Sequence, residues 1–144
     1  MKNLSLKGEF IELSPTDDED NELKNVHIRC AIKDIKNEKM IGFINSYQYN
    51  KIDNYAYFSL QTYKNVNGSI IFEASNMFFN YLFTCFPVRK IYFEGNCYCI
   101  DIMKELKKIG FKIEANLKKD CFIHGEYCDR YILALYKNDF CEGN

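Results

Sequence analysis

Hydrophobic and polar positions alternate in short runs over the first part of the chain, the pattern of strands with one buried face. Polar breaks at 36–39 and 50–54 separate the later runs and predict tight turns between them. Three or four antiparallel strands are therefore expected here, with Gly42 marking a bulge or a close approach of two backbones. The expected strands are 8–14, 26–35, 40–49 and 55–63.

The apolar spacing then changes to that of a helix over about 69–83. Pro87 ends this segment, and a short strand is expected at 90–94. A second helix is predicted over about 98–108, with Gly110 at its C-terminal end. A strand, a helix and a strand in succession predict a parallel pair of strands with a right-handed crossover.

The last segment, 111–136, divides into two strands at the turn 124–126. Its final part, 131–136, is apolar on both faces, which predicts a central place in the sheet. The pattern as a whole predicts one α+β domain over 1–144, with a mixed, mainly antiparallel sheet of about six or seven strands. No repeat or linker divides it.

Composition and charge exclude some classes of function. With 144 residues, 47% of them hydrophobic, the chain can bury a core of its own. Nineteen basic residues against 20 acidic ones, with no basic face, argue against nucleic acid binding. Glu73, Asn76 and Asn80 interrupt the longest apolar stretch, so we expect a buried helix there and no membrane span. Without the apolar run of a signal peptide at the start, a cytoplasmic location is expected.

The seven cysteines are odd in number and irregular in spacing, which argues against a disulfide framework. The residues that could act as zinc ligands are Cys97, Cys99, Cys121, His124 and Cys128. However, one residue separates the first two, where paired zinc ligands usually have two residues between them. We therefore expect reduced thiols and no metal.

The turn at Asn67, Gly68 and Ser69 lies between a predicted strand and the start of a predicted helix. The first N–H groups of a helix lack partners within it, and the helix dipole favours negative charge at that end. Such a turn is suited to a phosphate group. This raises the hypothesis of a coenzyme A-dependent acyltransferase.

Four segments in the same order, on matching predicted elements, resemble the GNAT superfamily of N-acyltransferases over roughly residues 40 to 137. Among its branches, the likeness is greatest to acetyltransferases of ribosomal proteins and of sugar amines. The segments are Asn67-Gly68-Ser69 with Glu73-Ala74, 89–94, 110–115 (Gly-Phe followed by a glutamate) and 125–135.

The resemblance implies a GNAT-like sheet with a central parallel β-α-β unit and helices on both faces. It also implies that the strands 55–63 and 90–94 splay apart to admit acetyl-CoA or another acyl-CoA. The pantetheine arm would pair with the backbone of the first of these strands, and the pyrophosphate would lie on the turn. The residues implied are Phe58, Ser59, Leu60 and Gln61 for pantetheine; Asn67, Gly68, Ser69 and Ile70 for pyrophosphate, with Lys64 adding charge; and Asn96 at the thioester.

The implied activity is transfer of an acyl group, acetyl first among the candidates, to a primary amine that attacks the thioester directly. Glu94 is the candidate base, although a solvated carboxylate at a strand end is an equal interpretation. Tyr98 or Cys99 would be the acid for the leaving thiolate. Glu73 is expected to support the structure. The acceptor would be a small-molecule or peptide amine. The sequence also leaves room for a homodimer.

Three departures from the family pattern keep a second hypothesis open, that of a GNAT-fold binding or assembly module without turnover. The segment 65–70 lacks the usual basic first residue and small sixth residue. Cys99 and Leu106 stand where many relatives have an asparagine and a catalytic tyrosine. About ten polar residues, 15–24, replace two helices that usually form a wall of the acceptor site.

Overall fold

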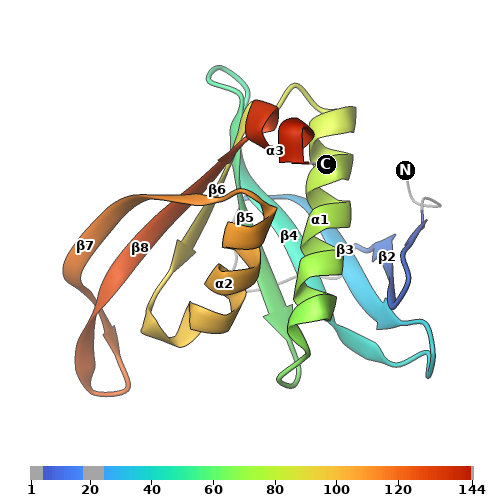
Figure 1. Ribbon diagram of the computed structural model, residues 1–144, viewed down its shortest axis with the longest axis horizontal. Coiled ribbons are helices and arrows are strands. Elements are labelled where there is room, and N and C mark those ends of the chain that lie inside the picture. The colour runs from blue at the N-terminus through green and yellow to red at the C-terminus, as the bar shows by residue number, and fades with distance from the viewer. Residues whose placement is uncertain (1–4, 18–24, 144) are drawn as a thin grey trace.

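The computed structural model describes residues 5–17 and 25–143, which form one mixed sheet with helices against it (Figure 1). The sheet has eight strands in the order β1-β2-β3-β4-β5-β6-β8-β7. Its strands are β1 (Leu6–Lys7), β2 (Ile11–Pro15), β3 (Val26–Asp34), β4 (Met40–Asn50), β5 (Tyr55–Thr62), β6 (Lys90–Gly95), β7 (Lys112–Ile123) and β8 (Glu126–Tyr136). The helices are α1 (Gly68–Cys85), the short 3₁₀ helix η1 (Cys97–Cys99), α2 (Ile100–Ile109) and α3 (Lys137–Gly143).

The predicted fold class is confirmed. Every neighbouring pair of strands is antiparallel except β5 and β6, which are parallel and joined through α1. The apolar last strand β8 lies between β6 and β7, inside the sheet as expected. Sequence patterns missed β1, which has two residues, and the terminal α3, because neither is long enough to show a period.

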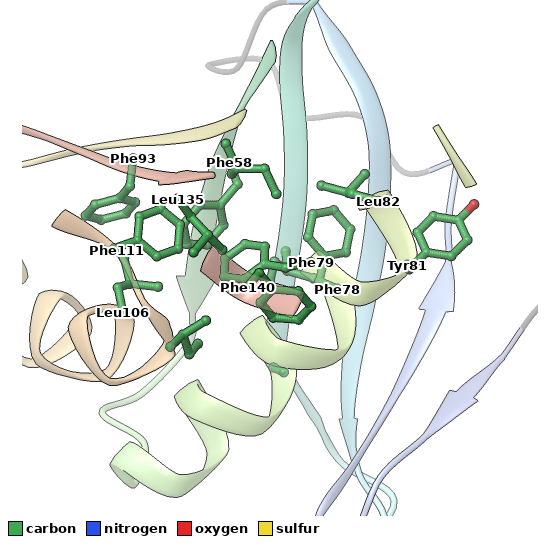
Figure 2. Packing of buried hydrophobic residues seen from close by; sticks show 14 of the residues in the cluster. Phe58, Phe78, Phe79, Tyr81, Leu82, Phe93, Leu106, Phe111, Leu135 and Phe140 are labelled. Atoms are coloured by element: carbon green, nitrogen blue, oxygen red, sulfur yellow. The ribbon is translucent and has the colours of Figure 1, made fainter. Parts of the chain in front are cut away.

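The helices build a single hydrophobic core on one face of the sheet (Figure 2). From α1, Phe78, Phe79 and Leu82 are fully buried, and Leu106 of α2 joins the same cluster. Phe140 of α3 packs on Phe83 of α1, with their ring centroids 5.4 Å apart. The described helices thus differ from the expectation of helices on both faces.

The segment 15–24 was expected to shape the acceptor site, but residues 18–24 lie outside the described residues, and so does most of the acidic stretch 17–20. No helix among the described residues is long and apolar enough to cross a membrane.

The face of the sheet opposite the helices bears a row of tyrosines. In β5, Ala56 and Phe58 are buried in the core, so Tyr55 and Tyr57 alternate to the other side. Tyr57 stacks on Tyr92 of β6 with centroids 5.0 Å apart, and it lies 5.6 Å from Tyr47 of β4. The two faces therefore differ in chemistry: one is a dry aliphatic and phenylalanine core, and the other presents phenol groups.

Candidate functional site

The parallel strands β5 and β6 are paired over only part of their length. Their register begins at Tyr55 with Lys90 and ends at Tyr57 with Tyr92. Beyond this point β5 continues along β4, and β6 continues along β8 as far as Gly95. In the described structure, the β5–β6 ladder thus stops before Phe58 and Phe93, and the diverging strands form a split in the sheet. This is the splaying that the GNAT resemblance implied.

Aromatic rings close the split on the helix side. Phe58 of β5 and Phe93 of β6 are both buried, and their centroids are 5.3 Å apart across the divergence. Phe58 also packs edge-on against Phe79 of α1 at 4.7 Å. These rings pack against one another in the core where the backbones of β5 and β6 separate.

Glu94 lies on the tyrosine face at the end of β6, beside the split. Its side chain is 39% exposed, and one carboxylate oxygen is 3.6 Å from Nη1 of Arg130 on β8. Burial, together with the charge of Glu94, raises the pKa of Tyr47 to about 12 and also raises the pKa of Tyr57. Both phenols therefore keep their protons at neutral pH and are available as hydrogen-bond donors.

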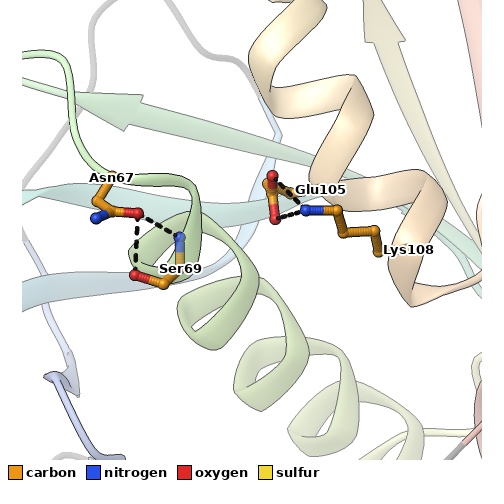
Figure 3. Close-up of polar contacts among 4 residues, drawn as sticks. All are labelled: Asn67, Ser69, Glu105 and Lys108. Atoms are coloured by element: carbon orange, nitrogen blue, oxygen red, sulfur yellow. Dashed lines mark hydrogen bonds and ion pairs between the residues drawn. The ribbon is translucent and has the colours of Figure 1, made fainter.

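The turn that starts α1 is held by its own side chain (Figure 3). Asn67 is the N-cap, and its Oδ1 accepts hydrogen bonds from the backbone N–H of Ser69 at 3.0 Å and from the Ser69 hydroxyl at 3.1 Å. The N–H of Ile70 donates to the Asn67 carbonyl at 3.0 Å. Two of the first-turn donors expected to face a phosphate are thus bonded within the turn.

A carboxylate from α2 lies directly beside this helix start. A Cβ placed on Gly68 would be 2.7 Å from Oε2 of Glu105. The Nζ of Lys108 is 3.2 Å from both oxygens of that carboxylate (Figure 3). The helix dipole favours an anion in this position. Glu105 is therefore an internal anion near the position where the resemblance places a pyrophosphate.

A surface hollow of about 740 Å³ opens at the same point. Gly68, Ser69, Glu105 and Lys108 line it where α1 and α2 meet, and it extends along α1 past Glu73. As predicted, Glu73 supports the structure: its Oε1 accepts hydrogen bonds from the backbone N–H groups of Phe10 and Ile11, at 2.9 and 3.1 Å.

The remaining candidates gather at η1, directly after β6. Asn96 caps this turn, because its Oδ1 accepts a hydrogen bond from the N–H of Tyr98 at 2.8 Å. The Cys99 thiol donates to the same oxygen at 3.9 Å. Tyr98 is 58% exposed and its ring packs on His124, 5.0 Å away in the turn between β7 and β8. Lys64 is exposed just after β5.

Sequence reasoning missed Glu105, Lys108 and Arg130. The buried pair Leu106 and Ile109 fixes the inner face of α2, but helical spacing does not tell which other helix flanks that face. Arg130 was seen only as part of a motif. Its pairing with Glu94 depends on the β6–β8 register, which places Ile132 opposite Glu94.

The fold is that of solved spermidine N-acetyltransferases. A variant of the spermidine/spermine N-acetyltransferase SpeG from Vibrio cholerae superposes with a TM-score of 0.73 over 83% of this chain and 72% of that one, at 22% identity. The spermidine N-acetyltransferase from Vibrio cholerae in complex with CoA and spermine gives 0.72 over 79% and 68%, also at 22% identity. No protein-family model matches the sequence, and no curated protein matches it. At this identity the likeness shows the fold alone.

Proposed function

We propose that this protein is an acyl-CoA-dependent N-acyltransferase, an acetyltransferase in the first instance, that acts on a primary amine. The observation that supports this most is the split between β5 and β6. Three paired positions followed by divergence leave an edge of β5, from Phe58 to Leu60, that β6 does not cover and that could pair with an extended amide chain. The pantetheine arm of coenzyme A is such a chain, with two amide groups.

The residues present fit the donor at its thioester end. The phenylalanines under the split exclude water from the reacting carbonyl, and an N–H of β5 would polarise it. At the phosphate end the fit requires Glu105 to move, because its carboxylate lies against Gly68. Lys108, whose side chain is 64% exposed, would then be free to approach the phosphates.

Glu94 would accept a proton from the attacking amine. It lies beside the split on the face opposite the core, so the amine would arrive from the side away from the helices. A protonated amine would be attracted there by the carboxylate and by the rings of Tyr57 and Tyr92. Arg130 lies 3.6 Å from the carboxylate and holds it beside the split.

The acid for the leaving thiolate would come from η1. Cys99 and Tyr98 both belong to it and flank the split after Gly95. Of the two, Cys99 is the better placed, since its thiol is half-buried and bonded to Asn96, whereas the ring of Tyr98 lies on His124.

The acceptor proposed is a small amine, in keeping with the spermine-bound neighbour of the same fold. The finer assignment to ribosomal-protein or sugar-amine acetyltransferases rests only on the sequence resemblance. From the sequence we also propose a cytoplasmic location and a homodimer.

A second candidate function, a GNAT-fold binding module without turnover, is favoured by one observation. The first-turn donors of α1 are capped by Asn67, and Glu105 places a negative charge beside them. A protein that had lost its donor would show this pattern.

Turnover of acetyl-CoA with a panel of primary amines, including polyamines, amino sugars and peptides with free N-termini, separates the two candidates. The acylated amine would be detected by mass spectrometry, because the protein's own thiols disturb colorimetric detection of free coenzyme A. We expect one amine class to be acetylated at a rate that rises with enzyme concentration. Donor binding without acetylation of any amine would favour the binding module.

A further inference from the structure

Two cysteines from separate parts of the chain meet beside the split. The Cys97 thiol of η1 donates to the sulfur of Cys128 on β8 across 3.3 Å. We propose that Cys97 and Cys128 form a reversible disulfide that links the start of α2 to β8. This inference rests on the geometry of the two thiols and does not depend on the proposed function.

The backbones already hold the two residues in place. The β6–β8 ladder ends at Gly95 paired with Tyr131, and each cysteine lies two or three residues beyond that pair. Bond formation requires the sulfurs to move from 3.3 Å to about 2 Å apart, which side-chain rotation can supply.

Solvent reaches the pair from the side of Cys97. Cys97 is exposed and Cys128 is half-buried, whereas Cys30 and Cys121 are buried. The hydrogen bond from Cys97, together with burial, raises the pKa of Cys128 to about 11, so its thiolate is scarce while both thiols are reduced. The exposed Cys97 is therefore the first to react.

The reaction takes a low-molecular-weight disulfide, such as oxidised glutathione, as its oxidant. The Cys97 thiolate attacks one sulfur of that disulfide and releases one glutathione thiolate. The Cys128 thiolate then attacks the Cys97 sulfur of the mixed disulfide and releases the second. The two cysteines together lose two protons and two electrons, and the oxidant becomes two thiols.

The consequence is local to the candidate site. Cys97 lies between Asn96 and Tyr98, so the bridge would fasten the η1 turn to the sheet. Dithiothreitol would release it again.

The test is disulfide mapping of the 144-residue chain after incubation with oxidised glutathione. Free thiols are alkylated in acid and the protein is cut with chymotrypsin without reduction. Cleavage after aromatic residues separates all four nearby cysteines, because Tyr98 lies between Cys97 and Cys99, and Phe122 and Tyr127 lie between Cys121 and Cys128. We expect one linked pair, 94–98 joined to 128–131, which dithiothreitol removes.

Two variants provide controls. Cys97→Ser should abolish the link and leave Cys128 open to alkylation. Cys85→Ser should leave it unchanged, because Cys85 is exposed but contacts no other cysteine side chain that the structure describes. Linkage of Cys128 to Cys121 or Cys99 instead, or glutathione on Cys97 and Cys128 separately with no link between them, would overturn the proposal.

Discussion

The two ends of the proposed donor site are built differently. The split between β5 and β6 is a property of the backbone: pairing stops after Tyr57 and Tyr92, and each strand then follows another neighbour. The turn at the start of α1 is a property of side chains, since Asn67 caps it and Glu105 fills the space beside Gly68.

This difference indicates which end of the proposed donor site can change its shape more easily. A strand divergence is fixed by register over the whole sheet and is lost only if the sheet rearranges. A capped turn with a carboxylate nearby can be altered by one side-chain rotation. We therefore expect substitutions at the split to have large effects, and substitutions at the turn to have small ones.

The largest expected effect is on chemistry at the split. Glu94→Gln removes the candidate base but keeps the shape of the side chain. The acylation rate should fall by about 10²-fold or more, because a positioned base contributes on this scale. Initial rates at saturating acetyl-CoA and amine measure it, and binding of acetyl-CoA should not change.

A matched control is Asp120→Asn, which removes the other carboxylate bonded to Arg130, at 2.7 Å, and leaves Glu94 in place. Its rate should stay near that of the wild type. Equal losses in both variants would show that Arg130, and not Glu94, is the group that matters.

The next largest effect is expected on stability, from a substitution where the backbones of β4 and β5 pack closely beside the split. A Cβ on Gly42 of β4 would collide with the backbone carbonyl oxygen of Gln61 on β5. Gly42→Ala should therefore force the strands apart and lower the free energy of unfolding by about 3 kcal/mol. Urea denaturation followed by circular dichroism measures this. A variant as stable as the wild type would mean that β4 does not hold the diverging part of β5.

A smaller effect is expected from charge at the turn. Glu105→Gln removes the negative charge beside Gly68 and should tighten acetyl-CoA binding about fivefold, or about 1 kcal/mol, the scale of one partly screened charge. Asp53→Asn is the control, since it makes the same change of charge at the opposite end of β5 from the turn. The eight residues of this strand separate the two positions by more than the screening length of about 10 Å in ordinary buffer. Equally tighter acetyl-CoA binding in both variants would show that the net charge of the protein, and not the position of Glu105, sets the affinity.

The smallest effect is expected from Gly68→Ala. Its Cβ meets only the far end of the Glu105 side chain, which can rotate away. The free energy of unfolding should change by less than about 1 kcal/mol, with the better helix propensity of alanine offsetting the displacement. Thermal denaturation of Gly68→Ala and Gly42→Ala in parallel compares the loss of stability at the two glycines directly. A loss as large as at Gly42 would show that the turn is as rigid as the split.

The elements along the chain were largely predictable. Alternation predicted β3, β4 and β5, and the spacing of Phe78, Tyr81 and Leu82 predicted α1. A strand or helix with one buried face has apolar residues at a regular spacing, so the sequence shows it. The helix was predicted to start at about residue 69, and in the structure it starts at Gly68 with Asn67 as its N-cap. The helix arrangement was wrong in one respect, since the described helices all pack into one core.

The site was only partly predictable. The resemblance, and not the alternation, implied the divergence after Tyr57, since both strands look continuous in sequence. Glu105 is 37 positions away from Gly68, and only the packing of α2 on α1 brings them together. The contact of Cys97 with Cys128 depends in the same way on the β6–β8 register.

The most direct test of the account is titration calorimetry of the wild-type protein with acetyl-CoA, with CoA and a longer acyl-CoA as comparisons, repeated with Glu105→Gln. We expect micromolar binding of one acyl-CoA in preference to CoA, and tighter binding by the variant. Binding by neither protein to any of the three would contradict the claim that the split between β5 and β6 holds an acyl donor.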